Sequence, residues 1–78
     1  MMKDTIAPQI VEDIIDEIAK KRKKDGLSHQ KLAELAQVDR STISLIEAKK
    51  RNPSFLIVLK LCRALDISLA KILKKYEK

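Results

Sequence analysis

The chain has 78 residues, of which 45% are hydrophobic and only two are aromatic. This length allows a single domain, and an aliphatic composition with one glycine and two prolines favours packed helices over a sheet of hairpins. The formal net charge of +6 is uneven, because residues 1–19 carry one cation against five anions and the remainder carries 16 cations against six anions. Such a basic body favours a polyanionic partner, although ordinary solubility would explain the charge equally well.

Several classes of protein are excluded by what the sequence lacks. One cysteine, Cys62, excludes an internal disulfide, and one histidine, His29, excludes a metal site that needs several His or Cys ligands. With no Gly-rich phosphate loop and no pairing of nucleophile and base, we expect no enzyme, no cofactor and no small-molecule substrate. No run approaches the roughly 20 apolar residues of a membrane span and no basic leader is present, which favours a cytoplasmic protein without a membrane partner.

The first predicted helix begins near Pro8, because the fixed φ of proline suits a first turn, and residues 1–7 are expected to be flexible. Apolar residues recur along this helix at helical spacing, with acidic residues on the other side. The cations of residues 20–24 lie in its last turns, where the helix dipole favours positive charge. Gly26 follows at the position of a left-handed C-cap and ends the helix.

A short pattern then marks four further helix starts. An apolar residue precedes a capping residue, and a second apolar residue follows four positions after the cap, at Ser28, Asp39 and Ser68 and in a weaker copy at Ser54. The pattern predicts helices over residues 29–36, 40–48, 55–65 and 69–76. Together with the first helix, they form a compact all-α bundle of five helices in one domain that spans residues 1–78.

Residues 28–48 have the form of a helix-turn-helix, since only three residues separate two short helices. The helix over residues 40–48 presents small polar side chains opposite its inward isoleucines, so its axis could lie deep in the major groove of DNA. Arg40 has the bidentate reach for guanine, and Leu45 can contact a thymine methyl. Ser41 and Ser44 can bond to several bases. The alternative is a solvated helix face with one stray leucine.

Phosphate contacts are expected at both ends of the motif. Three consecutive cations follow the helix over residues 40–48, and two polar residues open the preceding helix, where backbone N–H groups add an anion site: Lys49, Lys50 and Arg51, and Ser28 and His29. The alternative for the three cations is a favourable interaction with the helix dipole together with solubility. A catalytic or metal-binding role for His29 is not expected, because no second histidine or nucleophile accompanies it.

The chain closely resembles the Cro/phage-repressor-type helix-turn-helix family, also called the XRE family, in the segments GLSHQKLAELAQVDRSTISLIEAKKRNPS and LDISLAKIL. The resemblance covers about residues 10–73 and implies a five-helix DNA-binding domain that acts as a dimer on a palindromic operator. It also implies a structural pair between Arg22 and Glu47. The family's base-reading positions fall on Arg40, Ser41 and Leu45, and its phosphate-binding positions fall on Ser28, His29, Thr42 and residues 49–51.

Three positions depart from the family pattern. The family usually has Gln directly after the cap of the second helix, where this chain has His29 followed by Gln30. Glycine is usual where Gln37 and Lys49 stand. These two residues therefore either adopt a left-handed conformation, at a cost on the order of 1 kcal/mol each, or the backbone takes another path.

The helix over residues 55–65 carries more apolar residues than one buried face needs. The predicted buried face consists of Phe55, Val58, Leu59, Cys62 and Leu65. Leu56 and Ile57, together with Leu69, are then the expected interface of a symmetric dimer, which would set two reading helices about one DNA turn, roughly 34 Å, apart. The alternative is that Ile6 and the first helix cover Leu56 and Ile57 within one chain.

The leading interpretation is a sequence-specific regulator that binds double-stranded DNA as a homodimer, most simply a repressor, including of its own gene. It would be associated with the nucleoid when bound. The second interpretation is an antitoxin or bridging factor whose main partner is a protein, such as a toxin or a polymerase; the surplus apolar residues and the acidic start of the chain favour it. Among small stand-alone regulators, the sequence leaves open a phage-type repressor, an antitoxin and a controller of a restriction-modification system.

Overall fold

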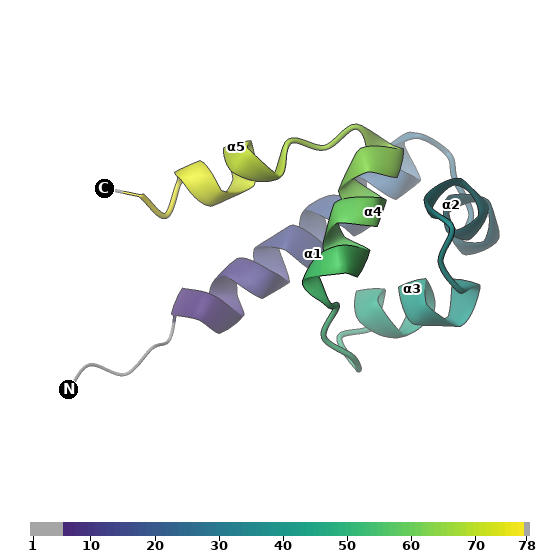
Figure 1. Ribbon diagram of the computed structural model, residues 1–78, viewed down its shortest axis with the longest axis horizontal. Coiled ribbons are helices and arrows are strands. Elements are labelled where there is room, and N and C mark those ends of the chain that lie inside the picture. The colour runs from purple at the N-terminus through teal and green to yellow at the C-terminus, as the bar shows by residue number, and fades with distance from the viewer. Residues whose placement is uncertain (1–5, 78) are drawn as a thin grey trace.

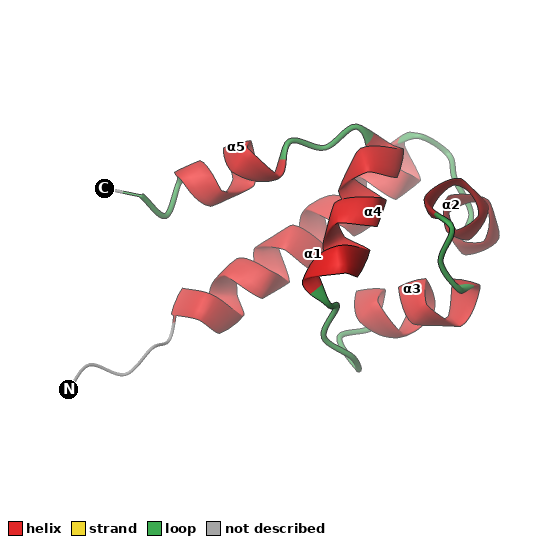
Figure 2. Ribbon diagram, viewed as in Figure 1, coloured by secondary structure: helices red, strands yellow, loops and turns green. Residues whose placement is uncertain are grey.

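A computed structural model describes residues 6–77, and within them it contains five helices and no strand (Figure 1, Figure 2). The helices are α1 (Ile6–Lys24), α2 (His29–Ala36), α3 (Arg40–Glu47), α4 (Phe55–Leu65) and α5 (Leu69–Lys74). The expected all-α fold and helix order are confirmed, with the expected bounds for α2 and α4 and slightly earlier ends for α3 and α5.

The start of α1 differs from expectation. The helix begins at Ile6, two residues before Pro8, so Ile6 and Ala7 belong to it. Residues 1–5 of the segment expected to be flexible lie outside the described residues. A proline is accepted here because the first turn of a helix has no intrahelical partner for its N–H groups.

Three of the four expected N-caps form. The Oγ atoms of Ser28, Ser54 and Ser68 accept hydrogen bonds from the backbone N–H three residues ahead, at 3.0, 3.1 and 3.3 Å. The expected cap by the Asp39 side chain is wrong, because its exposed carboxylate makes no such bond. Asp39 nevertheless has the extended backbone of a cap, and its carbonyl accepts a bond from Thr42 N–H at 3.1 Å.

The first four helices end at a residue in the left-handed conformation, with a reversed hydrogen bond from the next N–H back into the helix. After α1 this residue is Gly26, as expected, with φ 69°. After α2, α3 and α4 it is Gln37, Lys49 and Asp66, with φ of 58°, 63° and 56°. Gln37 and Lys49 therefore follow the backbone path that glycine usually takes, and their side chains carry the strain that a Cβ adds there.

The core lies where α4 crosses α1, and α2 and α3 close it at the end of the molecule away from both termini (Figure 1). α1 contacts α3, α4 and α5, whereas α2 contacts α3 and α4. The most deeply buried large side chains are Ile18, Leu32, Ile43, Ile46, Leu61 and Leu65. Helix α1 thus holds together both the helix-turn-helix and the C-terminal helix. None of the helices within residues 6–77 is long and apolar enough to cross a membrane.

The buried face of α4 differs in part from the predicted one. Val58, Cys62 and Leu65 are buried as expected, together with Leu61. Phe55 and Leu59 are instead exposed, with 71% and 38% of their surface accessible. The face through which α4 meets α1 and α2 is therefore rotated away from these two residues.

Candidate nucleic-acid interface

Helix α3 is anchored by one side and open on the other. Ile43 and Ile46 expose at most 1% of their surface, and they attach the helix to the core. The side opposite them carries Ser41, Ser44 and Leu45, and Arg40 flanks its N-terminal end; these four residues are here called the reading face. Arg40, Ser41 and Leu45 are exposed and Ser44 is half-buried. Helix α3 lies at the edge of the molecule (Figure 1).

The reading face has cations and free backbone donors around it. Lys50 and Arg51 follow α3, are exposed and form no ion pair within residues 6–77. Arg51 shares with Thr42 the lining of a shallow hollow of about 200 Å³ at the start of α4. Ser28 is exposed at the start of α2, and its hydroxyl is already used as the cap for Lys31 N–H. A phosphate at that point would meet the backbone N–H groups of the first turn.

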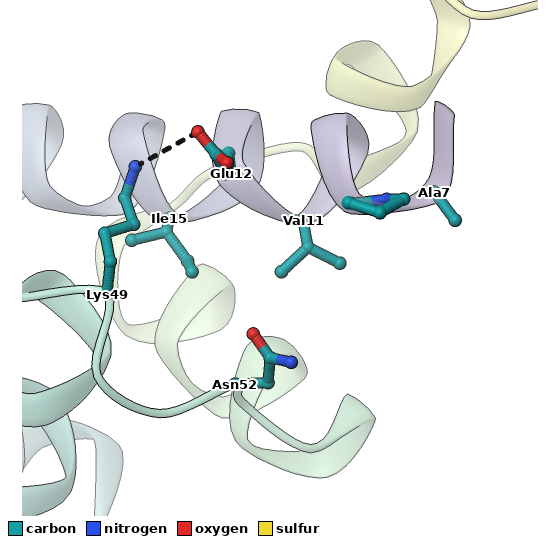
Figure 3. A pocket seen from close by; sticks show the side chains of 7 residues that line it. Ala7, Val11, Glu12, Ile15, Lys49 and Asn52 are labelled. Carbon is teal, nitrogen blue, oxygen red and sulfur yellow. Dashed lines mark ion pairs between the residues drawn. The ribbon is translucent and has the colours of Figure 1, made fainter. Parts of the chain in front are cut away.

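One residue expected to contact phosphate, Lys49, forms ion pairs with α1. The Lys49 ammonium points back to α1, where it lies 3.7 Å from Glu12 Oε1 (Figure 3). It also lies 3.0 Å from Asp16 Oδ1. These carboxylates raise the pKa of Lys49, mainly through the hydrogen bond to Asp16. The Lys49 ammonium is therefore paired with carboxylates of its own chain, whereas its expected phosphate contact stays a prediction.

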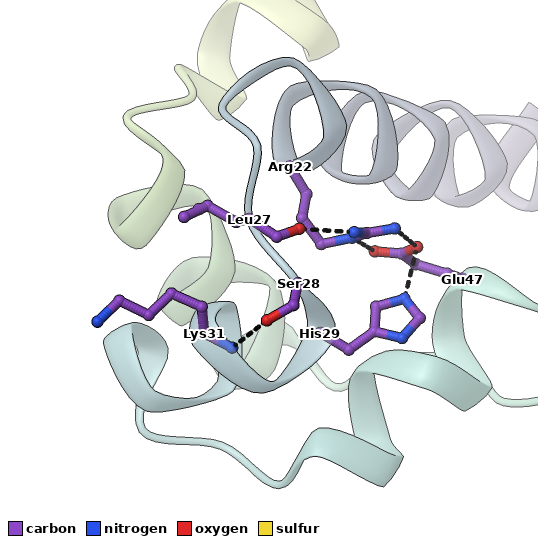
Figure 4. A network of polar contacts seen from close by, with 6 residues as sticks. All are labelled: Arg22, Leu27, Ser28, His29, Lys31 and Glu47. Atoms are coloured by element: carbon purple, nitrogen blue, oxygen red, sulfur yellow. Dashed lines mark hydrogen bonds and ion pairs between the residues drawn. The ribbon is translucent and has the colours of Figure 1, made fainter.

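Arg22 and Glu47 join the end of α1 to the end of α3 (Figure 4). Arg22 Nε and Nη2 donate to Glu47 Oε2 and Oε1 at 2.7 and 2.9 Å, which is the bidentate geometry of a strong pair. Arg22 Nη1 also donates to the Leu27 carbonyl at 2.8 Å, and so reaches the loop before α2. The side chains of Arg22 and Glu47 are only 11% and 10% exposed. The pair therefore connects three segments: the end of α1, the loop before α2 and the end of α3.

His29 completes this network from the first turn of α2. Its Nε2 lies 3.1 Å from Glu47 Oε1, so one carboxylate joins a residue of α1, one of α2 and the end of α3. Burial raises the pKa of Glu47, but the hydrogen bonds and charges of Arg22 and His29 outweigh burial, and the pKa of Glu47 is lowered from its ordinary value. The same hydrogen bond stabilises the charged form of the partner, and it raises the pKa of Arg22. Glu47 is thus held as an anion.

Two of these contacts were not predicted from the sequence. The spacing of Glu12 and Asp16, four residues apart on one helix, indicates a two-carboxylate surface but not which cation it meets. His29 carries no signal for its bond to Glu47, because the two residues approach only when α2 and α3 pack. The Arg22–Glu47 contact, in contrast, was implied by the family resemblance.

The comparisons with known proteins agree with this geometry. The sequence matches the family model described as helix-turn-helix over residues 18–72, which is more than half of the chain. No match was found among curated proteins. Among solved structures, the chain is similar to the restriction-modification controller protein C.AhdI from Aeromonas hydrophila, with 34% sequence identity, a TM-score of 0.71, and coverage of 83% of this chain and 97% of that chain. This family and this neighbour are regulatory proteins, not enzymes. The chain belongs to the XRE-type helix-turn-helix family of DNA-binding transcription regulators.

Proposed function

We propose that the chain is a sequence-specific repressor that binds a palindromic operator as a dimer, with α3 of each protomer in the major groove. The observation that carries the proposal is the exposure of Arg40, Ser41 and Leu45 on a helix whose other side is buried. A major groove of about 12 Å admits a helix that has small side chains on the approaching side. The proposed phosphate contacts lie at the start of the motif, within it and after it: Ser28, His29, Thr42, Lys50 and Arg51.

The proposed base contacts follow from chemistry. Arg40, in the first turn of α3, can donate two parallel hydrogen bonds to guanine. Ser41 and Ser44 are short and can bond to several bases, whereas Leu45 can contact a thymine methyl. The network of Arg22, His29 and Glu47 supports these contacts by fixing the end of α3 to α1 and α2. Specificity then requires no movement of α3 on binding.

The proposed dimer surface lies at the start of α4. Phe55, Leu56 and Leu59, here called the α4 patch, are 71%, 60% and 38% exposed. The patch continues into an apolar hollow of about 270 Å³ between α1, α4 and α5, whose lining includes Phe55, Leu69 and Leu73. Ile57 packs against the core, so its share in the interface is smaller than that of Leu56. Ile6, which could have covered Leu56 within one chain, is itself 57% exposed, and Leu56 stays 60% exposed. This favours a second chain as the partner that covers Leu56.

The likeness to C.AhdI favours one biological role among those open to a small regulator. We infer that the chain controls transcription within a restriction-modification system. The support is the 34% identity over most of both chains. Repression of a promoter by occupancy is the simplest action for a domain of this size.

Selection of bound duplexes from a random library, followed by fluorescence anisotropy on the selected operator, tests DNA recognition. Arg40→Ala should weaken the selected operator by about 1–3 kcal/mol and relax the preference at one base position. Lys50→Ala should instead weaken all sequences alike and reduce the salt slope by about 1 for each phosphate that the protein no longer binds. A protein that enriches no sequence from the library would refute the proposal.

Sedimentation of the wild type, Leu56→Glu and Leu35→Glu tests the dimer. Leu35 is 51% exposed on α2 and lies outside the α4 patch, so it is a matched control for a new surface charge. We expect a dimer for the wild type and Leu35→Glu and a monomer for Leu56→Glu. A monomeric wild type at the concentration that saturates the operator would exclude the dimer.

A protein-interaction module, such as an antitoxin or a bridging factor, is the second candidate. The α4 patch favours it, because three exposed apolar residues on one short helix suit a protein partner of either kind. The salt dependence separates the two candidates. Four cations per dimer, from Lys50 and Arg51, should give a log–log slope of about −3.6 for operator binding. A protein-interaction module would form no specific complex with the duplex.

A further inference from the structure

Two carboxylates on α1 hold the first cation of the loop that follows the reading helix. Lys49 Nζ lies within ion-pair distance of both Asp16, at 3.0 Å, and Glu12, at 3.7 Å. Figure 3 shows the lysine side chain reaching from the loop to α1, above Asn52 and beside Ile15. Lys50 and Arg51, the next two residues, have no such partner within residues 6–77. One of three consecutive cations is thus neutralised by the chain itself.

The local backbone places Lys49 in the turn that ends α3. Lys49 N–H donates to the Ile46 carbonyl at 3.0 Å, and Lys50 N–H donates to the Leu45 carbonyl at 2.9 Å, which ends α3 in a reversed turn. Lys49 adopts φ 63° in this turn and its side chain leaves toward α1. Glu12 and Asp16 stand one helical turn apart, where two like charges repel each other unless a cation lies between them.

We infer that Glu12 and Asp16 are positioning residues that keep the Lys49 ammonium off the DNA phosphates, and that they thereby lower both the affinity and the salt dependence of operator binding. The inference rests on the proposed function. A cation adds to the affinity for DNA by releasing condensed counterions, and each contact adds about 0.9 to the log–log salt slope. Lys49 releases none while the carboxylates hold it. Once freed, its four-carbon side chain can turn to the phosphates that Lys50 and Arg51 meet.

The test measures the salt slope of operator binding for Glu12→Gln/Asp16→Asn. Both residues are more than 60% exposed, so neither substitution disturbs the core, and circular dichroism verifies the fold. Freeing one lysine per protomer should steepen the slope of a dimer by about 1.8. The loss of affinity between 50 and 200 mM salt then becomes about tenfold larger than in the wild type.

Lys49→Ala in both backgrounds shows whether this lysine is the cause. In the wild type it should leave the slope unchanged, and in Glu12→Gln/Asp16→Asn it should return the slope to the wild-type value. Glu17→Gln is the matched control for Asp16→Asn, because both residues are exposed on α1 and lose one charge, but only Asp16 contacts Lys49. The control should leave the slope unchanged, whereas Asp16→Asn should steepen it.

The possible failures are distinct. If Lys49→Ala lowers the slope of the wild type as much as Lys50→Ala does, Lys49 already contacts phosphate and the inference is wrong. If Glu17→Gln and Asp16→Asn have equal effects, overall charge rather than the Lys49 contact sets the affinity, which also overturns it. A wild type that binds no operator at all overturns the proposed function, and this inference with it.

Discussion

The pair between Arg22 and Glu47 gives the sharpest prediction about stability. Arg22→Met keeps the apolar stem of the side chain but leaves the Glu47 carboxylate, which is 10% exposed, with His29 as its one remaining partner. Removing one partner of a buried pair costs about 3–5 kcal/mol. The lower end applies here because each side chain keeps a tenth of its surface in water and His29 remains in contact. We therefore expect a loss of about 3 kcal/mol.

A loss of this size is large for a domain of 78 residues, whose total stability is of order 4–12 kcal/mol. Urea denaturation at pH 7 and 25 °C measures it, with an unchanged m value as the sign of two-state unfolding. The thermal midpoint should fall by about 12–24 °C. Lys75→Met is the control, because the Lys75–Asp13 pair has a 58% exposed lysine and should contribute less than about 1 kcal/mol.

The double variant Arg22→Met/Glu47→Met decides what causes the loss. Replacing both residues of a buried ion pair by apolar side chains of similar size often leaves the free energy of unfolding unchanged. Only the Leu27 carbonyl and His29 then lack their partners, so the double variant should recover most of the loss and remain about 1 kcal/mol below the wild type. A double variant as unstable as Arg22→Met would refute an unpaired buried charge as the cause.

Three further effects should be measurable by the same denaturation. Gln37→Gly should stabilise the protein by about 0.5–1 kcal/mol, since it removes a Cβ from a residue at φ 58°; destabilisation would mean that the Gln37 side chain makes a contact of its own. Ser54→Ala should cost about 1 kcal/mol and Asp39→Ala much less, because only Ser54 caps with its side chain; equal costs would refute that distinction. The folded-state pKa of Glu47 is lowered by Arg22, so the stability from this pair should be complete above the ordinary pKa of 4.5 and be lost as the pH falls through the lower folded value. The stability difference between the wild type and Glu47→Gln should therefore shrink on acidification, and a pH-independent difference would contradict this assignment.

Much of the fold can be read from the sequence because its signals are local. Four caps and their apolar flanks predict where helices begin, and Gly26 predicts where the first one ends, since these features involve residues within one or two turns. The inward position of Ile43 and Ile46 follows from helical spacing alone. Which side of α3 faces outward is therefore a property of the sequence.

Contacts between helices needed the tertiary structure. The periodicity of α4 admits two apolar faces, and only its packing against α1 and α2 selects Leu61 for the core and leaves Phe55 exposed. The tertiary structure also decides which charges are paired. The three consecutive cations of residues 49–51 cannot be told apart from the sequence. The left-handed turn at Lys49 and the approach of Asp16 separate one of them from the other two, since the strength of an ion pair depends on distance in space and not on distance along the chain.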